Sequence, residues 1–191
     1  MKNNKYDKWL KGDAITQTSP LIKKMAKKFK GDTEIGRLFN LHKWLKKQKY
    51  QKVDDNIILK REFFRKRNAH QIIADGYFTG CSDYSIVAAV LLRELGIPTK
   101  IVQVVNMDWL KGKPSKLVGH ILLEIYIYDR WLIFDSFKGL IGFDYSFLNF
   151  VVYKKGADIL DIGIRTLDEL RPKLDDFRKE WQRKNKKMIV D

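Results

Sequence analysis

Apolar residues recur at helical spacing in two segments near the start of the chain. Residues 19–30 begin with Ser19 and Pro20, a helix N-cap followed by proline at the first helical position. The apolar residues that follow form one face of this helix, and lysines form the other face. Residues 35–49 show a similar apolar face, and Asp32 can cap this second helix. We therefore predict two amphipathic helices whose apolar faces pack on a core formed elsewhere in the chain.

A more apolar helix is predicted in the middle of the chain, after Gly80. From Ile86 onward almost every residue up to Leu95 is apolar, which is typical of a helix buried on all sides. Gly96 stands where a left-handed C-cap belongs, and Pro98 prevents the helix from continuing. We expect this helix to be the central one.

Three β-rich runs follow the central helix, over residues 100–106, 119–128 and 131–137. The last two alternate with a period of two and are joined by a short turn at Asp129 and Arg130. A polar loop over residues 106–118 separates the first two runs. The pattern predicts an antiparallel meander packed on the helix.

The rest of the chain predicts fewer elements. Residues 50–68 are polar and charged with two apolar anchors and indicate no definite element, whereas residues 148–153 predict a further strand. A charged helix is predicted over residues 166–187, opened by a capping box of Thr166 and Glu169, with Pro172 in its first turns. No linker or internal repeat divides the chain, so we expect one α+β domain over residues 1–191. Its expected parts are a basic helical part, a catalytic core and a helical extension, over residues 1–67, 68–153 and 154–191.

Composition and charge narrow the class of protein. With 191 residues and 45% hydrophobic residues, the chain is long and apolar enough to form a core, which excludes a disordered or low-complexity polymer. The net charge is +15, and the first 70 residues carry 20 basic and 7 acidic groups. Such a field could attract nucleic acid or an acidic protein, although a solvated face of lysine-rich helices is the favoured explanation. No stretch is apolar enough to span a membrane, so we expect a cytoplasmic protein without membrane contact.

The single cysteine, Cys81, excludes an internal disulfide and a zinc site built from cysteine pairs, and we expect neither a metal nor a cofactor. It lies at the predicted start of the buried helix, where the helix dipole and free N–H groups favour a thiolate. A thiolate nucleophile also needs a histidine, which in turn is held by a hydrogen-bonding residue. His120 and Asp135, on the second and third predicted strands, are the candidates.

Parity places His120, Leu122 and Glu124 on one face of their strand, and a two-residue turn at residues 129–130 places Asp135 opposite Glu124 on that face. This register leaves Asp135 four residues from His120, about 13 Å, which is too far for a hydrogen bond. A bulge, a wider turn or strong twist must close the gap.

Simpler interpretations of these residues exist. A lone cysteine is among the most buried residue types, although Cys81 precedes the apolar part of its helix and stands next to polar Ser82. Asp83 fits a structural role, because a carboxylate in the first helical turn is favoured by the dipole. His42 and His70 lie in the basic third of the chain, and we expect them to be structural or solvated.

The run from Thr79 to Tyr84, continued by the segment Leu91–Lys100, resembles the nucleophile helix of the transglutaminase-like superfamily. Its members show Gly-x-Cys-x-Asp, an apolar helix and Leu-Gly-Ile-Pro-x-Arg. The spacing of Gly119, His120 and Glu124, and of Trp131 and Asp135, resembles the His and Asp strands of the same family. The resemblance covers about residues 68–137, with weaker similarity over residues 35–50.

This resemblance implies a papain-like fold with extra N- and C-terminal helices, and a thiol enzyme that acts on amide bonds of a protein or peptide. It implies Cys81 as nucleophile, His120 as base and acid, and Asp135 as orienting residue. The backbone N–H of Cys81, at the predicted helix start, is the candidate oxyanion donor. Hydrolysis is favoured over acyl transfer, because nothing in the sequence indicates a site for an amine that excludes water. Leu122 and Lys100 depart from the family pattern, where an aromatic residue and an arginine are common. Candidate groove residues are Tyr77, Thr79, Gly80, Gly119 and Leu122, and Asp83 and Glu124 are expected to be structural residues near the site.

Overall fold

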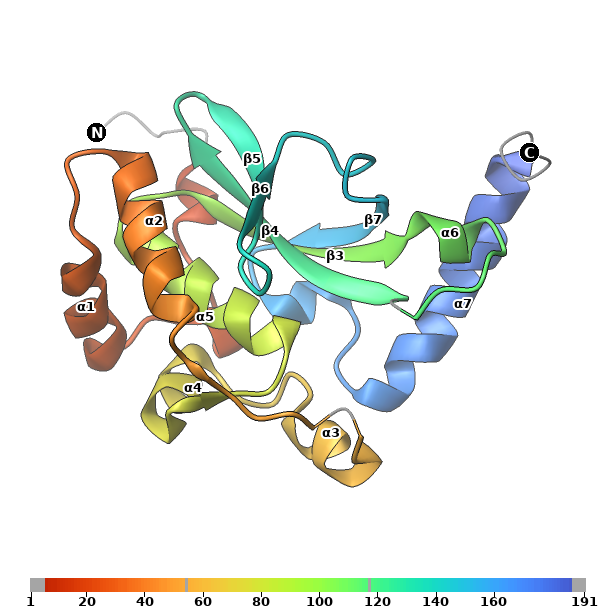
Figure 1. Ribbon diagram of the computed structural model, residues 1–191, viewed down its shortest axis with the longest axis horizontal. Helices are drawn as coiled ribbons and strands as arrows, with labels where there is room; N and C mark the ends of the chain where they lie inside the picture. Colours follow the sequence, from red (N-terminus) through yellow and green to blue (C-terminus); the bar gives the residue numbers. More distant parts are fainter. Residues whose placement is uncertain (1–5, 54, 117, 187–191) are drawn as a thin grey trace.

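The computed structural model describes residues 6–53, 55–116 and 118–186. A five-stranded antiparallel sheet in the order β6-β5-β4-β3-β7 forms its centre (Figure 1). Strands β3 to β5 follow one another as the predicted antiparallel meander. Strand β6, which was not predicted, continues the meander, and β7 returns to pair with β3, a pairing that was not predicted either. The strands are β3 (Thr99–Asn106), β4 (Gly119–Ile127), β5 (Arg130–Asp135), β6 (Leu140–Gly142) and β7 (Phe150–Gly156).

A short parallel pair of strands, β1 (Lys49–Tyr50) and β2 (Tyr77–Phe78), is separate from this sheet. The α-helices are α1 (Pro20–Ala26), α2 (Glu34–Leu45), α3 (Ile57–Phe63), α4 (Ala69–Asp75), α5 (Cys81–Glu94), α6 (Met107–Leu110) and α7 (Leu167–Lys184). Single 3-10 turns are η1 (Asp7–Trp9), η2 (Ala14–Thr16), η3 (Lys27–Phe29) and η4 (Ile159–Ile162). Within the described ranges, none of the helices has the length and apolar character that crossing a bilayer requires.

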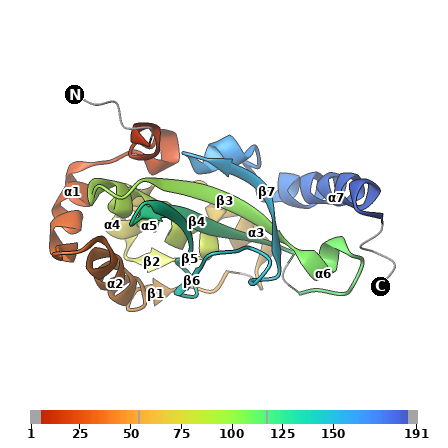
Figure 2. The same cartoon turned by 90° about the horizontal axis from the view of Figure 1, so that it is seen from above.

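Helix α5 is the central helix, as its apolar sequence predicts. Residues 84–92 are buried without interruption, and α5 packs against the face of β4 that carries Ile121, Leu123 and Ile125. Figures 1 and 2 show α1, α2 and α4 around α5, with α7 at the other end of the molecule beside α6. The main core therefore lies between α5 and the sheet.

Capping residues determine several of the observed helix ends. The Ser19 hydroxyl accepts the N–H of Ile22 and caps α1, and Gly96 ends α5 with φ of +80°, a left-handed conformation that glycine adopts without strain. The cap of α2 is Thr33 rather than Asp32, because Thr33 Oγ1 accepts the N–H of Gly36 at 3.1 Å.

Other boundaries differ from the prediction. Helix α2 ends at Leu45, four residues early, because the chain then enters β1. The loop after β3 contains α6, and the segment after β1 contains α3, capped by Asn56. Strand β7 begins at Phe150, two residues late, and α7 ends at Lys184, while the predicted end at Lys187 lies outside the described residues.

The hairpin between β4 and β5 turns one residue earlier than predicted. Ile127 pairs with Arg130, so the two turn residues are Tyr128 and Asp129, both with positive φ (51° and 61°). This turn type matches the twist of the strands. The register therefore shifts by two residues and brings Asp135 level with Leu122, about 7 Å along the strand from His120 instead of about 13 Å.

Candidate active site

Helix α5 begins beside β4, where the neighbouring strand β5 has ended. The Ile121 N–H donates to the Cys81 thiol, and the Ser85 hydroxyl, four residues along α5, donates to the Ile121 carbonyl at 3.3 Å. Both backbone groups of Ile121 thus point to the side that β5 leaves open after Asp135. The edge of β4 positions the first turn of α5, and Cys81 remains partly exposed there.

His120 and Asp135 are brought together by the shifted register. His120 Nε2 lies 2.8 Å from Asp135 Oδ2, and the two side chains are only 3% and 2% exposed. Asp135 Oδ1 accepts the N–H groups of Phe137 (3.1 Å) and Lys138 (3.0 Å), which fixes the carboxylate. The imidazole stacks on Phe150, and its Nδ1 remains for the hydrogen bond with Cys81.

The electrostatics of the three side chains favour a charged pair. Burial opposes ionisation of Cys81, yet the hydrogen bond and positive charge of His120 and the Ile121 N–H together lower the pKa of the thiol. Burial likewise disfavours a charged His120, but Asp135 and Cys81 raise its pKa to about 9. The pKa of Asp135 is lowered despite its burial, mainly by its hydrogen bond with His120. Around neutral pH the arrangement therefore favours a thiolate next to an imidazolium.

A cavity of about 560 Å³ opens over Cys81. Three of the predicted groove residues, Thr79, Gly80 and Gly119, line it. Tyr77 does not, because its ring packs on the guanidinium of Arg67. The prediction of Tyr77 as a groove residue is therefore corrected.

Leu122 does not line the cavity either, so its prediction as a groove residue is corrected. It is fully buried in the cluster of Val102, Val104, Ile133 and Phe150, on the face of the sheet that does not contact α5. Side chains alternate along β4, and because Ile121 packs with α5, the Leu122 side chain lies on the opposite face of the sheet.

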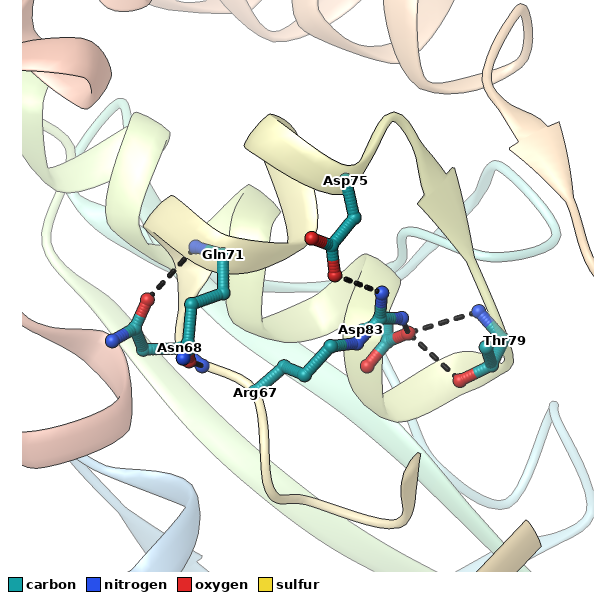
Figure 3. Close-up of polar contacts among 6 residues, drawn as sticks. All are labelled: Arg67, Asn68, Gln71, Asp75, Thr79 and Asp83. Atoms are coloured by element: carbon teal, nitrogen blue, oxygen red, sulfur yellow. Dashed lines mark hydrogen bonds and ion pairs between the residues drawn. The ribbon is translucent and has the colours of Figure 1, made fainter. Parts of the chain in front are cut away.

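Asp83 has a structural role that differs from the predicted interaction with the helix dipole. Figure 3 shows its carboxylate turned back toward the residues before α5, where Oδ2 accepts the N–H (2.9 Å) and hydroxyl (2.8 Å) of Thr79. Arg67 donates to the same oxygen at 2.5 Å and also binds Asp75 at 2.8 Å. In the same view Asn68 caps α4 through Gln71. The buried pair of Arg67 and Asp83 thus anchors the segment that leads into Cys81.

Glu124 lies farther from the cavity than predicted. It stands four residues along β4 from His120 and does not line the cavity. Lys100 (2.8 Å) and Lys155 form ion pairs with its carboxylate, and the Tyr145 hydroxyl donates to it at 2.7 Å. These contacts give Glu124 a structural role in the sheet.

Two cavity residues, Gln103 and Arg65, were not predicted. The Gln103 side chain donates to the His120 carbonyl at 3.0 Å and accepts a hydrogen bond from Arg65 at 2.5 Å. Arg65 is 3% exposed, also donates to the Ile164 carbonyl, and its positive charge helps to lower the pKa of Cys81. A polar residue in the middle of an apolar strand is a signal for Gln103, whereas Arg65 follows α3, an element that the pattern did not predict.

The basic first third of the chain borders a second groove, between α1, α2 and the end of α5. Lys23, Lys27, Lys30 and Arg37 line it together with Asp32 and Glu94. Acidic residues thus partly balance the lysines, and binding of nucleic acid or an acidic protein by these helices stays a prediction. Within the described ranges, His, Cys, Asp and Glu side chains form no group of three that could hold a metal ion.

We compared the chain with curated protein sequences and with solved structures. A comparison with curated protein sequences found no match. A presumed cysteine protease from Cytophaga hutchinsonii superimposes with a TM-score of 0.62 at 20% identity, over 83% of this chain and 49% of that chain. This chain therefore spans about half the length of that structure, and the similarity is one of fold. LapG from Legionella pneumophila matches with a TM-score of 0.47 at 16% identity, over 84% of this chain and 94% of that chain.

The family model of the transglutaminase-like superfamily matches residues 23–136, more than half of the chain. The match begins well before the segment that carries the resemblance in the sequence, so it also takes in α2 and most of α1. It ends one residue after Asp135. The chain belongs to the transglutaminase-like superfamily.

Proposed function

We propose that the protein is a cysteine-dependent enzyme that cleaves amide bonds of a peptide or protein through a thioester. The observation that carries the proposal is the hydrogen-bonded series Cys81, His120 and Asp135, in which Cys81 begins α5 and lines the cavity together with His120. Nucleophile, base and orienting residue are the parts that acyl transfer requires.

The proposed reaction begins with attack of the Cys81 thiolate on the amide carbonyl carbon. The new S–C bond places negative charge on the carbonyl oxygen, and we expect the N–H of Cys81, the first residue of α5, to stabilise it. His120 gives its proton to the amine as the C–N bond breaks, which leaves a thioester. Water then attacks the thioester, His120 takes its proton, and the acid leaves with the thiolate restored.

The group that attacks the thioester, water or an amine, distinguishes hydrolysis from acyl transfer. We favour water as acceptor, because Cys81 is partly exposed and the cavity above it is open to solvent. The test is incubation with a peptide mixture in the presence and absence of a primary amine, with products identified by mass spectrometry. We expect new carboxyl ends in wild type and none in Cys81→Ala. Amine-tagged products in excess of carboxyl ends would favour a transferase, and cleavage that persists in Cys81→Ala would contradict the proposal.

The raised pKa of His120 predicts an upper limit for activity. Amide cleavage needs a protonated His120 for the leaving amine, so the rate is expected to fall as pH rises through about 9. Asp135→Asn removes the charge that favours the imidazolium. The fall in rate at high pH, the alkaline limb of the pH profile, is therefore expected to move to lower pH by about one unit or more. The pH dependence of kcat/KM checks this, with Asp176→Asn on the exposed face of α7 as the control that leaves the limb in place. An unchanged limb in Asp135→Asn would contradict the assigned role.

A further inference from the structure

Positive charge surrounds the cavity over Cys81 on several sides. Lys60 and Arg65 come from α3 and the residues after it, Lys116 from the loop before β4, and Lys138 from the turn after β5. These segments are far apart in the sequence, and the fold brings their cations to one cavity. Lys116 and Lys138 are exposed, whereas Arg65 is buried next to the thiol.

Negative charge at the same cavity is largely compensated. Asp83 is the one carboxylate among the described lining residues, and Arg67 and Thr79 already bind it. Lys116 and Lys138 have no carboxylate within ion-pair distance in the part of the chain that the structure describes. The charge of Lys138 acts on Asp135, which lies behind His120 and is hydrogen-bonded to it. The cavity therefore presents a net positive field to a substrate.

Aromatic side chains strengthen this field. Phe63, Phe64 and Phe137 line the cavity together with the cations. Apolar walls lower the local dielectric and focus the field of nearby charges, so a carboxylate that enters is attracted more strongly than at an open surface.

We infer that the cavity selects substrates that carry a carboxylate close to the amide bond to be cleaved, as an acidic peptide segment does. This inference rests on the proposed function and adds the class of substrate to it. The carboxylate would lie between the exposed Lys116 and Lys138, with Arg65 supplying positive charge from below. A neutral or basic segment in the same place would offer Lys116 and Lys138 no carboxylate.

The test uses two alkylating reagents that differ only in charge, iodoacetate and iodoacetamide. Both attack the same Cys81 thiolate, so the ratio of their rate constants reports the field in the cavity and cancels changes in thiol reactivity. N-acetylcysteine measured alongside gives the ratio for a free thiol. We expect the iodoacetate to iodoacetamide ratio to be about tenfold or more higher at Cys81 than in this reference, and to fall as salt is added.

The imidazolium of His120 also attracts an anion, so variants are needed to distinguish the effect of the lysines on the rate ratio from that of His120. Lys116→Gln and Lys138→Gln are each expected to lower the ratio about twofold, and the double variant about fourfold. Lys24→Gln, at another exposed lysine, which lies on α1 and does not line the cavity, is the matched control and leaves the ratio unchanged. Because both cavity lysines are exposed, these variants are expected to fold.

The outcomes separate the two proposals. A ratio equal to that of N-acetylcysteine, or one that neither cavity variant lowers, would overturn the inference even if Cys81 reacts rapidly with both reagents. Slow reaction with both reagents would contradict the proposed function, while the ratio would still report the charge of the cavity. Peptides that differ only by Glu or Gln next to the cleaved bond extend the test to catalysis, and equal kcat/KM for the two would also overturn the inference.

Discussion

His120→Ala is expected to lower the rate of amide cleavage by about 10⁴-fold, because one side chain supplies the partner of the thiolate and the acid for the leaving amine. His120 Nε2 is held 2.8 Å from Asp135, and its other ring nitrogen is hydrogen-bonded to Cys81. The measurement is kcat/KM for a cleaved peptide, with the melting temperature recorded to show that the variant folds.

His70→Ala is the matched control for this variant. His70 is exposed on α4, hydrogen-bonds Ser19 at 3.1 Å and is not among the residues that line the cavity. We expect its kcat/KM to stay within about twofold of wild type. Retention of more than a tenth of the activity in His120→Ala would show that cleavage takes place elsewhere.

Asp83→Ala is expected to lower the free energy of unfolding by about 3–5 kcal/mol, because it leaves the buried Arg67 without its main partner. Asp83 is 2% exposed and also accepts two hydrogen bonds from Thr79, which lose their acceptor in the variant. Urea unfolding measures this change. The segment before Cys81 is expected to loosen at the same time.

Asp75→Ala tests whether burial is the reason for this large effect. Asp75 binds the same guanidinium at 2.8 Å, but its side chain is 39% exposed. The expected loss is below about 1 kcal/mol, since solvent replaces an exposed partner readily. Equal losses in the two variants, or a loss below about 1 kcal/mol in Asp83→Ala, would contradict the anchoring role of the buried pair.

Much of the fold follows from local signals in the sequence. The cap formed by Ser19 and Pro20, the left-handed Gly96 and the apolar run after Ile86 correctly predict the start of α1 and the end and burial of α5. The alternation after Gly119 predicts the meander. Signals of this kind act over a few residues, so they can be recognised without knowledge of the rest of the chain.

The candidate site could be predicted only in part, because its geometry depends on contacts between distant segments. The distance between His120 and Asp135 depends on a turn at Tyr128, and a tyrosine with positive φ leaves no recognisable signal in the sequence. Arg65 reaches the cavity from a segment without clear periodicity, and its partner Gln103 belongs to another strand. The position of Cys81 at a helix start is local, which is why it could be predicted.

The most direct test of the central claim, a thiolate at Cys81 paired with His120, is the rate of alkylation by iodoacetamide from pH 4 to 9. In wild type we predict a thiol that titrates well below the ordinary pKa of about 8.5, and in His120→Ala a return toward that value. A slow reaction in wild type that titrates near 8.5 and does not change in His120→Ala would contradict the account.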